Sequence, residues 1–293
     1  MRILVTGCNG QVGYCLTKIL SNTESVVLLA VDREELDITN QEAVNDAVKA
    51  FNPTIIINAA AHTAVDRAEQ EVELSYAINR DGPKFLAEAA QGIGAAILHI
   101  STDYVFEGNK VGEYVESNAT NPQGVYGASK LAGEIAVAEG CDKHIILRTA
   151  WVFAEHGNNF VKTMLRLAAT HNELDIVGDQ FGGPTYAGDI AEALVEIAKT
   201  ISNNKSVDYG VYHYSGLPHV SWYEFADTIF DTAVGHCVLE NKPILSSITT
   251  EQYPTPAKRP SNSKLSTRKI NEAFAIQASD WVKALKNIKA YAE

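Results

Sequence analysis

The sequence predicts an α/β protein in which a doubly wound parallel sheet carries a smaller, mainly helical C-terminal lobe. Short apolar runs alternate with longer segments of helical periodicity over residues 1–150, and this alternation is typical of a parallel sheet with helices on both faces. Several runs are apolar without interruption, as expected for strands buried on both faces. A glycine-rich turn follows the first run at once, and such sheets bind ligands beyond the carboxyl ends of their strands.

The elements of the N-terminal half alternate in order along the chain. Val12, Leu16 and Leu20 recur on one side of a helix, whereas residues 26–31 are continuously apolar, as in a buried strand. We expect strands over residues 3–6, 26–31, 54–58, 96–101 and 144–148, and helices over residues 11–21, 40–50, 71–92 and 127–139. Because crossovers between parallel strands are right-handed, the carboxyl ends of these strands meet at one edge of the sheet.

Gly7, Gly10 and Gly13 stand between the first strand and the first helix. Glycine lets a backbone turn tightly and approach a pyrophosphate, whose charge the helix N-terminus then favours. The spacing is G-x-x-G-x-x-G and not G-x-G-x-x-G, but the physical role is the same. An ordinary glycine-rich turn is the alternative. The position at the first strand–helix junction favours a Rossmann-type dinucleotide site.

The ends of the second and third strands carry residues suited to a dinucleotide. Asp32 ends the second strand, where a carboxylate either accepts hydrogen bonds from the adenosine ribose hydroxyls or is a solvated loop charge. Asp32 would repel a 2′-phosphate and Arg33 beside it would attract one, so the cofactor is NADH or NADPH, with NADH favoured. Residues 58–63 include small side chains that let a cofactor lie against the backbone. His62 among them is adjacent to the cofactor or structural.

The C-terminal half departs from the regular alternation. We expect a helix over 159–170, a strand over 174–177, a turn at residues 182–184, a helix over 187–201, a strand over 210–214 and mostly helix beyond 221, interrupted by a Pro-rich stretch over 253–260. The predicted dinucleotide-binding domain is residues 1–150 plus about 186–214. Residues of about 151–185 plus 215–293 form the predicted substrate lobe, and the interface between the two is the expected substrate cleft.

Composition and charge restrict the partners that the chain can have. The 293 residues carry a net charge of −12, which argues against a surface that binds a nucleic-acid backbone. No apolar run reaches membrane-spanning length, and the chain starts on a strand-like run with no cleavable leader. The four cysteines lack C-x-x-C spacing and His62 has no second ligand nearby, so we expect free thiols and no metal site. These features predict a cytoplasmic protein that binds neither membrane nor nucleic acid.

Tyr126 and Lys130 form the pair most suited to acid–base chemistry. They stand four residues apart and share a helix face. A phenol ionises near pH 10, and a nearby ammonium group lowers that pKa by stabilising the phenolate. Lys130 could do this while also binding nicotinamide ribose hydroxyls. Thr102, in the run Ser101-Thr102-Asp103 at the end of the fourth strand, could hold a carbonyl oxygen, although such runs also form ordinary turns.

At this point the chain resembles the extended short-chain dehydrogenase/reductases, and more narrowly the dTDP-4-dehydrorhamnose reductase family. The resemblance covers nearly the whole chain. It rests on residues 7–13, 58–66, 101–106, 126–134, 148–153, 157–160 and 259–265. The last three segments fall in the substrate lobe and therefore concern the sugar nucleotide. The family's activity would be reduction of the C4 keto group of dTDP-4-dehydro-L-rhamnose by NADH or NADPH to give dTDP-L-rhamnose.

The resemblance also implies roles for individual residues. Thr102, Tyr126 and Lys130 match the catalytic trio. The implied cofactor contacts are Gly7, Gly10, Gln11, Val12, Gly13, Asp32, Asp37, Ile38, Ala61, His62, Thr63, Tyr126 and Lys130. Thr102 and Asp103 would meet the keto-sugar, Trp151 would pack beside the sugar or nucleotide, and Arg259 and Asn262 would reach the dTDP end. Arg259 suits a diphosphate because guanidinium pairs bidentately with its oxygens.

Departures from the family pattern bear on the alternatives. Some relatives dimerise through a magnesium site of surface carboxylates, one of which would fall at position 15. This chain has Cys15 there, so we expect a monomer or a weak homodimer. Dehydratases on this scaffold place Glu after Thr-Asp, and Tyr104 at that position counts against elimination. A reductase or epimerase for another nucleotide sugar, or a non-catalytic regulatory subunit like that of methionine adenosyltransferase, is the alternative.

Overall fold

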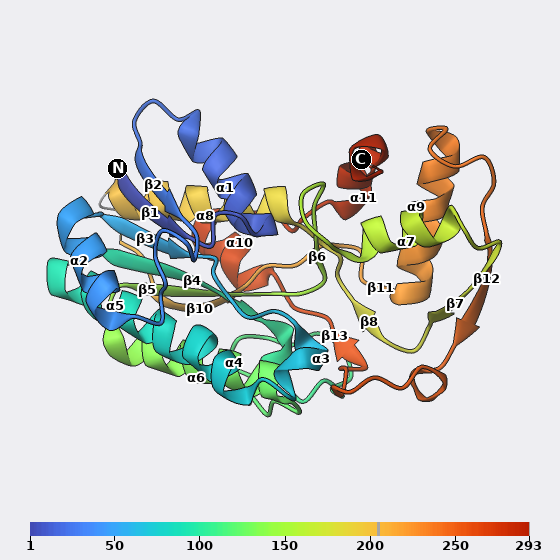
Figure 1. Ribbon diagram of the computed structural model, residues 1–293, viewed down its shortest axis with the longest axis horizontal. Helices are drawn as coiled ribbons and strands as arrows, with labels where there is room; N and C mark the ends of the chain where they lie inside the picture. Colours follow the sequence, from blue (N-terminus) through green and yellow to red (C-terminus); the bar gives the residue numbers. More distant parts are fainter. Residues whose placement is uncertain (204–205, 293) are drawn as a thin grey trace.

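The computed structural model describes residues 1–203 and 206–292. Its largest sheet has six parallel strands in the order β2-β1-β3-β4-β5-β10 (Figure 1). The strands are β1 (Arg2–Thr6), β2 (Val27–Val31), β3 (Ile55–Asn58), β4 (Ala96–Thr102), β5 (His144–Thr149) and β10 (Gly210–His213). The order in which the strands are connected reverses at β1, because β2 lies on one side of β1 and β3 on the other. Sheets of this kind bind their ligands at such a reversal.

Helices cover both faces of this sheet, as the fold class predicts. One face packs on α1 (Gln11–Ser21), α8 (Ala187–Ser202) and α10 (Arg268–Phe274). The other packs on α2 (Gln41–Phe51), α5 (Gly82–Ile93) and α6 (Val125–Gly140). Leu4 faces the second layer while Ile3 and Val5 face the first. The continuous apolar runs therefore fill two cores, and the predicted α/β class is confirmed.

The single helix expected over residues 71–92 is divided in the structure. Val65–Ala68 form the short α3, Val72–Tyr76 form α4, and Ala77–Asp81 make a π-helical turn before α5. The backbone carbonyl of Asn79 in this turn lies 2.0 Å from where a Cβ on Gly133 of α6 would stand. The extra residue of the π turn therefore presses against α6 at a position that only glycine can occupy, and π turns of this kind often mark functional sites.

The C-terminal lobe lies beside the large sheet and contains more strand than the sequence indicated (Figure 1). Its helices are α7 (Phe160–Ala168), α9 (Trp222–Gly235) and α11 (Trp281–Leu285), with 3₁₀ turns at Thr250–Gln252 and Ile288–Tyr291. Its strands are β6 (Val152–Phe153) with β9 (Thr185–Tyr186), β7 (Glu173–Val177) with β12 (Ile244–Ile248), and β8 (Phe181–Gly182) between β11 (Val220–Ser221) and β13 (Asn262–Ser263). A further 3₁₀ turn, Asp103–Val105, follows β4.

β12 is the longest of the strands that were not expected from the sequence. Its residues are mostly exposed and follow no apolar alternation, so only its parallel pairing with β7 identifies it. Across residues 1–203 and 206–292, no helix is both long enough and apolar enough to cross a membrane. All four cysteines are free thiols, as expected from their spacing.

Candidate active site

The three glycines of the first turn are needed for different physical reasons. Gly7 has φ of +71°, and a Cβ there would stand 2.6 Å from the backbone of Ala60. A Cβ on Gly13 would stand 2.0 Å from the carbonyl oxygen of Gly7. Gly10 has an ordinary φ, and a Cβ would meet only the Gly7 carbonyl oxygen, at 3.4 Å. Gly7 and Gly13 are thus required by the fold, whereas the missing side chain of Gly10 leaves open space above the turn.

A cavity of about 310 Å³ lies at this turn, where the strand order reverses. The predicted cofactor residues that it gathers are Gly7, Gly10, Asp32, Asp37, Ile38 and Ala61. The remaining lining residues are Arg33, Leu36, Thr39, Ala59, Ala60, Leu74, Ala77 and Ile78. Leu74, Ala77 and Ile78 come from α4 and the π turn, and sequence reasoning missed them because it placed a single regular helix there. Their apolar side chains give the cavity an apolar wall, which suits an aromatic base.

The end of β2 presents both charges that distinguish the two nicotinamide cofactors. The Asp32 carboxylate accepts backbone hydrogen bonds from Asn9 at 2.8 Å and from Arg33 at 2.7 Å. These bonds hold the carboxylate across the turn, and the Arg33 side chain lines the same cavity. Hydrogen bonds from Thr39 lower the pKa of Asp37 on the next loop. The cavity wall therefore presents two carboxylates and one guanidinium close together.

Other predicted cofactor residues lie outside this cavity wall. Val12 is packed in the core beneath the turn, and Thr63 is exposed. Gln11 accepts a hydrogen bond from Asn159 at 3.1 Å, which ties the turn to the substrate lobe. The His62 ring contacts Ser75 at 3.0 Å and Glu71 at 3.0 Å. Of the two interpretations of His62, these contacts give it a structural task, namely holding α4 against the loop after β3.

Close packing brings Tyr126 to the end of β4. A Cβ on Gly127 would stand 2.2 Å from the carbonyl oxygen of Tyr104, so α6 approaches the turn after β4 at a glycine. The rings of Tyr104 and Tyr126 meet edge to face with centroids 5.4 Å apart. Glu69 accepts the first amide of α6, that of Val125, at 2.8 Å. The start of α6 is therefore capped from another element, which fixes the direction of Tyr126.

The ionisation of Tyr126 differs from the sequence expectation. Burial raises the pKa of its phenol above the ordinary value, and a hydrogen bond with Thr102 opposes this only in part. Lys130, expected to lower that pKa, donates instead to the carbonyl oxygen of Ile100 at 2.6 Å. Burial lowers the pKa of Lys130 itself to about 8. The phenol is thus held protonated, as a proton donor requires, and the expected direction of its shift is corrected.

Asp103 links the end of β4 to the substrate lobe. Its carboxylate accepts a hydrogen bond from Thr102 at 3.0 Å and a short one from Ser263 on β13. Burial raises the pKa of Asp103 to about 6, while the two hydroxyl donors oppose the rise. Ser263 was not predicted as a site residue, although it lies within the segment 259–265 that carries the family resemblance.

The predicted substrate residues occupy three different settings. Trp151 has φ of +49° and stacks on Trp222 with ring centroids 3.5 Å apart. Arg259 pairs with Asp66 at 2.8 Å, and its guanidinium charge opposes the rise that burial causes in the pKa of Tyr104. The Asn262 amide donates to two backbone carbonyls of the loop over residues 110–112, at 2.6 and 2.7 Å. Trp151 also packs on the cluster that contains Val105 and Phe106, just beyond β4, whereas the Asn262 amide is taken up by the loop.

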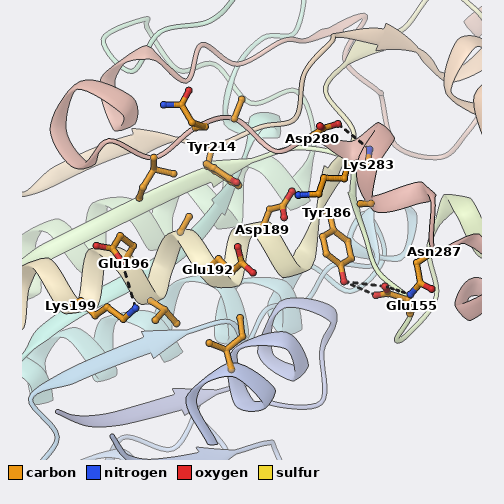
Figure 2. Close-up of a pocket in the computed structure, with 17 residues that line it drawn as sticks. Glu155, Tyr186, Asp189, Glu192, Glu196, Lys199, Tyr214, Asp280, Lys283 and Asn287 are labelled. Atoms are coloured by element: carbon orange, nitrogen blue, oxygen red, sulfur yellow. Dashed lines mark hydrogen bonds and ion pairs between the residues drawn. The ribbon is translucent and has the colours of Figure 1, made fainter. Parts of the chain in front are cut away.

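A second cavity, of about 730 Å³, lies along α8 (Figure 2). Carboxylates dominate its wall, and several are already bound within the chain: Tyr186 donates to Glu155 at 3.0 Å, and Lys199 pairs with Glu196 at 3.7 Å. In the described part of the chain, its lining includes none of the residues predicted for the site. Thr102 and Tyr126 line neither this cavity nor the one at the glycine turn; they lie at the carboxyl end of β4 and at the start of α6.

Comparison with known proteins agrees with this geometry. The family model described as "RmlD substrate binding domain" matches residues 1–292. The dTDP-4-dehydrorhamnose reductase of Aggregatibacter actinomycetemcomitans is 54% identical over 292 residues, covering 100% of this chain and 99% of the relative. The crystal structure of the Clostridium acetobutylicum enzyme of that name superposes with a TM-score of 0.90 at 41% identity, covering 98% of each chain. The Bacillus anthracis enzyme, solved in complex with NADP, gives 0.89 at 40% identity, covering 98% of this chain and 97% of that chain.

Proposed function

Because the chain belongs to the dTDP-4-dehydrorhamnose reductase family, we propose roles for its individual residues in that reaction. The protein is an NAD(P)H-dependent oxidoreductase of dTDP-rhamnose synthesis. It reduces the C4 keto group of dTDP-4-dehydro-L-rhamnose to give dTDP-L-rhamnose. The observation that carries the role assignment is the placement of the Tyr126 phenol, whose pKa burial raises, beside the Thr102 hydroxyl at the carboxyl end of β4.

The residues around the first turn fit a dinucleotide. The space left by Gly10 accepts a pyrophosphate, and the amides at the start of α1 point toward it. Asp32 and Arg33 surround the ribose end, and Leu74 and Ile78 flank the base. When bound, the reduced nicotinamide supplies the hydride. The sequence favoured NADH, but the position of Arg33 in the cavity wall favours NADPH. The Bacillus anthracis relative was solved with NADP, which supports the same choice.

Tyr126 and Thr102 act on the oxygen that is being reduced. Thr102 donates its one hydroxyl hydrogen to Asp103 in the free protein. On substrate binding it turns that hydrogen to the carbonyl oxygen and fixes the oxygen beside the phenol. Tyr126 donates its proton as negative charge develops on that oxygen. General acid catalysis of this kind contributes about 10²–10⁴-fold to the rate. The burial that raises the pKa of Tyr126 keeps the proton on the phenol until the oxygen becomes basic enough to take it.

The substrate lobe supplies the contacts to the sugar nucleotide. We assign cofactor binding to residues 1–150 plus about 186–214 and sugar-nucleotide binding to about 151–185 plus 215–293. The packing of α8 and β10 with the large sheet supports this division, whereas α10 of the second set also packs on that sheet. Asp103 receives a sugar hydroxyl, Trp151 packs on the sugar or base, and Arg259 pairs with the diphosphate. Asn262 shapes the loop over residues 110–112 and acts through it.

A coupled assay tests the reductase role and the assignment of Tyr126. With dTDP-4-keto-6-deoxy-L-mannose supplied, we expect loss of reduced-nicotinamide absorbance, faster with NADPH than with NADH. Tyr126→Phe keeps the buried ring but removes the proton, so kcat should fall by about 10²–10⁴-fold. A thermal melt of the variant controls for folding. Turnover near that of the parent would contradict the role of Tyr126, and no consumption with either cofactor would contradict the reductase itself.

We further propose that the enzyme works in the cytoplasm as a monomer or weak homodimer and binds no nucleic acid. The net charge of −12 supports the last point. Burial, followed by the nearby Glu155 carboxylate, raises the pKa of the Cys15 thiol to about 11. A protonated thiol is a poor replacement for a carboxylate ligand, which supports assembly without a metal bridge. Light scattering of the purified protein with and without added magnesium checks this.

A further inference from the structure

A row of buried polar side chains crosses the large sheet beneath Lys130. Thr6, Asn58 and His99 occupy neighbouring register positions on β1, β3 and β4, and each is at most 1% exposed. They continue the strand face whose preceding residues belong to the core under α2, α5 and α6. Burying polar groups costs free energy unless they are hydrogen-bonded. The bonds that this row makes therefore decide what it does.

The hydrogen bonds fix the orientation of Asn58 and the tautomer of His99. The amide of Ala60 donates to Asn58 Oδ1 at 3.1 Å, and Thr6 donates to the same oxygen at 2.7 Å. A backbone amide can only donate, so Oδ1 must face Ala60, and Nδ2 must face His99. Nδ2 lies 3.0 Å from His99 Nδ1, which must then accept. A neutral imidazole carries one hydrogen, and here it is on Nε2.

The Nε2–H of His99 points at a group that, when charged, has no acceptor. His99 Nε2 lies 3.5 Å from Lys130 Nζ, and Lys130 also donates to the carbonyl oxygen of Ile100 at 2.6 Å. An ammonium group has three donors and no lone pair, so it meets Nε2–H donor to donor. A neutral amine has a lone pair and can accept that hydrogen. The arrangement therefore opposes the charged form of Lys130.

We propose that His99 is a positioning residue that favours the neutral amine of Lys130, so that Lys130 can release its proton during turnover. This inference rests on the proposed function, in which Tyr126 gives its proton to the sugar oxygen. The phenolate that remains must regain a proton. One N–H bond of Lys130 breaks, the proton becomes available to the phenolate on the same helix, and the amine lone pair accepts the Nε2–H of His99. Solvent then reprotonates Lys130 before the next turnover.

The charges around Lys130 are consistent with this role. On its own helix Glu134 raises the pKa of Lys130, but both Glu134 oxygens are bound by Arg148 of β5, at 2.9 and 2.6 Å. Tyr126 on the same helix is protonated. From β4, His99 stays neutral because burial and Lys130 hold its pKa well below the ordinary value. Burial prevails over Glu134, and the pKa of Lys130 falls to about 8.

Two measurements on the free protein test the inference. Long-range ¹H–¹⁵N correlation of histidine-labelled wild-type protein should show His99 with its hydrogen on Nε2. In protein labelled with ¹³C-lysine, Lys130 is assigned by comparison with Lys130→Arg and titrated in wild type and in His99→Asn. The Asn oxygen can replace Nδ1 as the acceptor for Asn58. The Asn amide nitrogen then stands near the place of ring Cδ2, farther from Lys130 Nζ than Nε2, so the opposed donor is withdrawn. We expect the acid dissociation constant of Lys130 to fall about tenfold in the variant.

The rise in the pKa of Lys130 in His99→Asn should also shift the pH profile of kcat. Lys130 must carry a proton to release one, so activity declines as pH rises through its titration, and this decline should move to higher pH in His99→Asn. His144→Asn, which changes a histidine bound to the carbonyl oxygen of Cys141 at 2.7 Å, is the control and should leave Lys130 unchanged.

A hydrogen on Nδ1 of His99, or an unaltered Lys130 titration in folded His99→Asn, would overturn the inference. If His99→Asn does not fold, the tautomer in wild-type protein still decides. Because neither measurement needs substrate, absence of reductase activity would contradict the proposed function and leave this test standing.

Discussion

Gly10 and Gly13 are the same residue type with different reasons to be glycine, and substitution separates them. A methyl group on Gly13 would collide with the carbonyl oxygen of Gly7 at 2.0 Å, whereas on Gly10 the only neighbour is at 3.4 Å. We expect Gly13→Ala to lose at least about 2 kcal/mol of stability through backbone displacement. Gly10→Ala should stay within about 1 kcal/mol of the parent and bind cofactor at least about tenfold more weakly, because its methyl group occupies the pyrophosphate space.

Denaturant unfolding and fluorescence titration with NADPH measure the two effects on the glycine turn. Unchanged cofactor affinity in Gly10→Ala would mean that the open space above the turn serves another purpose.

Asp103 gives stability a defined pH dependence. Its pKa rises from 3.8 to about 6 on folding because the carboxyl is buried. The folded state therefore binds more protons than the unfolded state between these values, and stability from this group is full below pH 3.8 and lost as pH rises to about 6. Asp103→Asn removes the titration. Its stability relative to wild type should grow over that range by on the order of 2–3 kcal/mol.

Chemical denaturation at several pH values checks this behaviour of Asp103. A constant difference between variant and parent from pH 4 to 7 would contradict it. Activity should fall in the same variant, since Asp103 also faces the proposed sugar site.

Helix α6 packs closely against its neighbours because the residues at its contact points are glycines, which have no side chain. Gly133 lies against the carbonyl oxygen of Asn79 in the π turn, 2.0 Å from where its Cβ would stand. Gly133→Ala must push α6 from that turn and should cost at least about 2 kcal/mol. Gly92 in α5 is the matched control, because a Cβ there meets nothing within 4 Å. Gly92→Ala should stabilise by about 0.5–1 kcal/mol through helix propensity.

Thermal unfolding and kcat should separate these two glycine substitutions. Because α6 carries Tyr126 and Lys130, Gly133→Ala should also lower kcat, while Gly92→Ala should leave it unchanged. Equal stability of the two variants would show that the π turn yields without cost.

Elements were predictable from the sequence to the extent that their apolar patterns matched a regular period. The strands of the large sheet and the helices on its faces are recognisable in the sequence, because their buried faces give regular apolar patterns. Their order and type were therefore correctly expected. The π turn at 77–81 was not expected, because its Asn79 carbonyl packs against Gly133 of α6, about fifty positions away in the chain. Nor was β12 expected, since its exposed residues depend on pairing with β7.

The candidate site shows the same division between local and distant causes. Thr102 and Tyr126 were identifiable because each stands at a fixed place in a local motif. The cavity residues Leu74 and Ile78 were not, because their position depends on how the π turn meets the sheet edge. The opposite direction of the Tyr126 pKa shift likewise depends on burial and on Lys130 turning to Ile100, and spacing along the helix contains neither fact.

For the whole molecule, the pair Arg259–Asp66 joins the substrate lobe to the sheet. The two side chains are 32% and 38% exposed and 2.8 Å apart, and Asp66 also accepts the amide of Ala257 at 3.2 Å. Exposed ion pairs contribute about 0–1 kcal/mol, so Asp66→Asn should change stability by less than about 1 kcal/mol. It should raise KM for the sugar nucleotide several-fold, because Arg259 loses the partner that directs it.

Steady-state kinetics with urea unfolding distinguish these effects of Asp66. Asp81→Asn removes another partly exposed pair, that with Arg80 at 2.7 Å, and should leave KM unchanged. An unchanged KM in Asp66→Asn would show that the pair has no role in orienting Arg259.

The strand order has a consequence for how the chain is made. β1 to β5 are complete once residue 149 has been synthesised, but the strand that covers the open edge of β5 is β10, at residues 210–213. A ribosome must therefore extend the chain by some sixty residues while β5, with the apolar run Ile145-Ile146-Leu147, presents unpaired backbone groups. Such edges recruit other strands. The nascent chain is most vulnerable to aggregation, and most in need of a chaperone, during that interval.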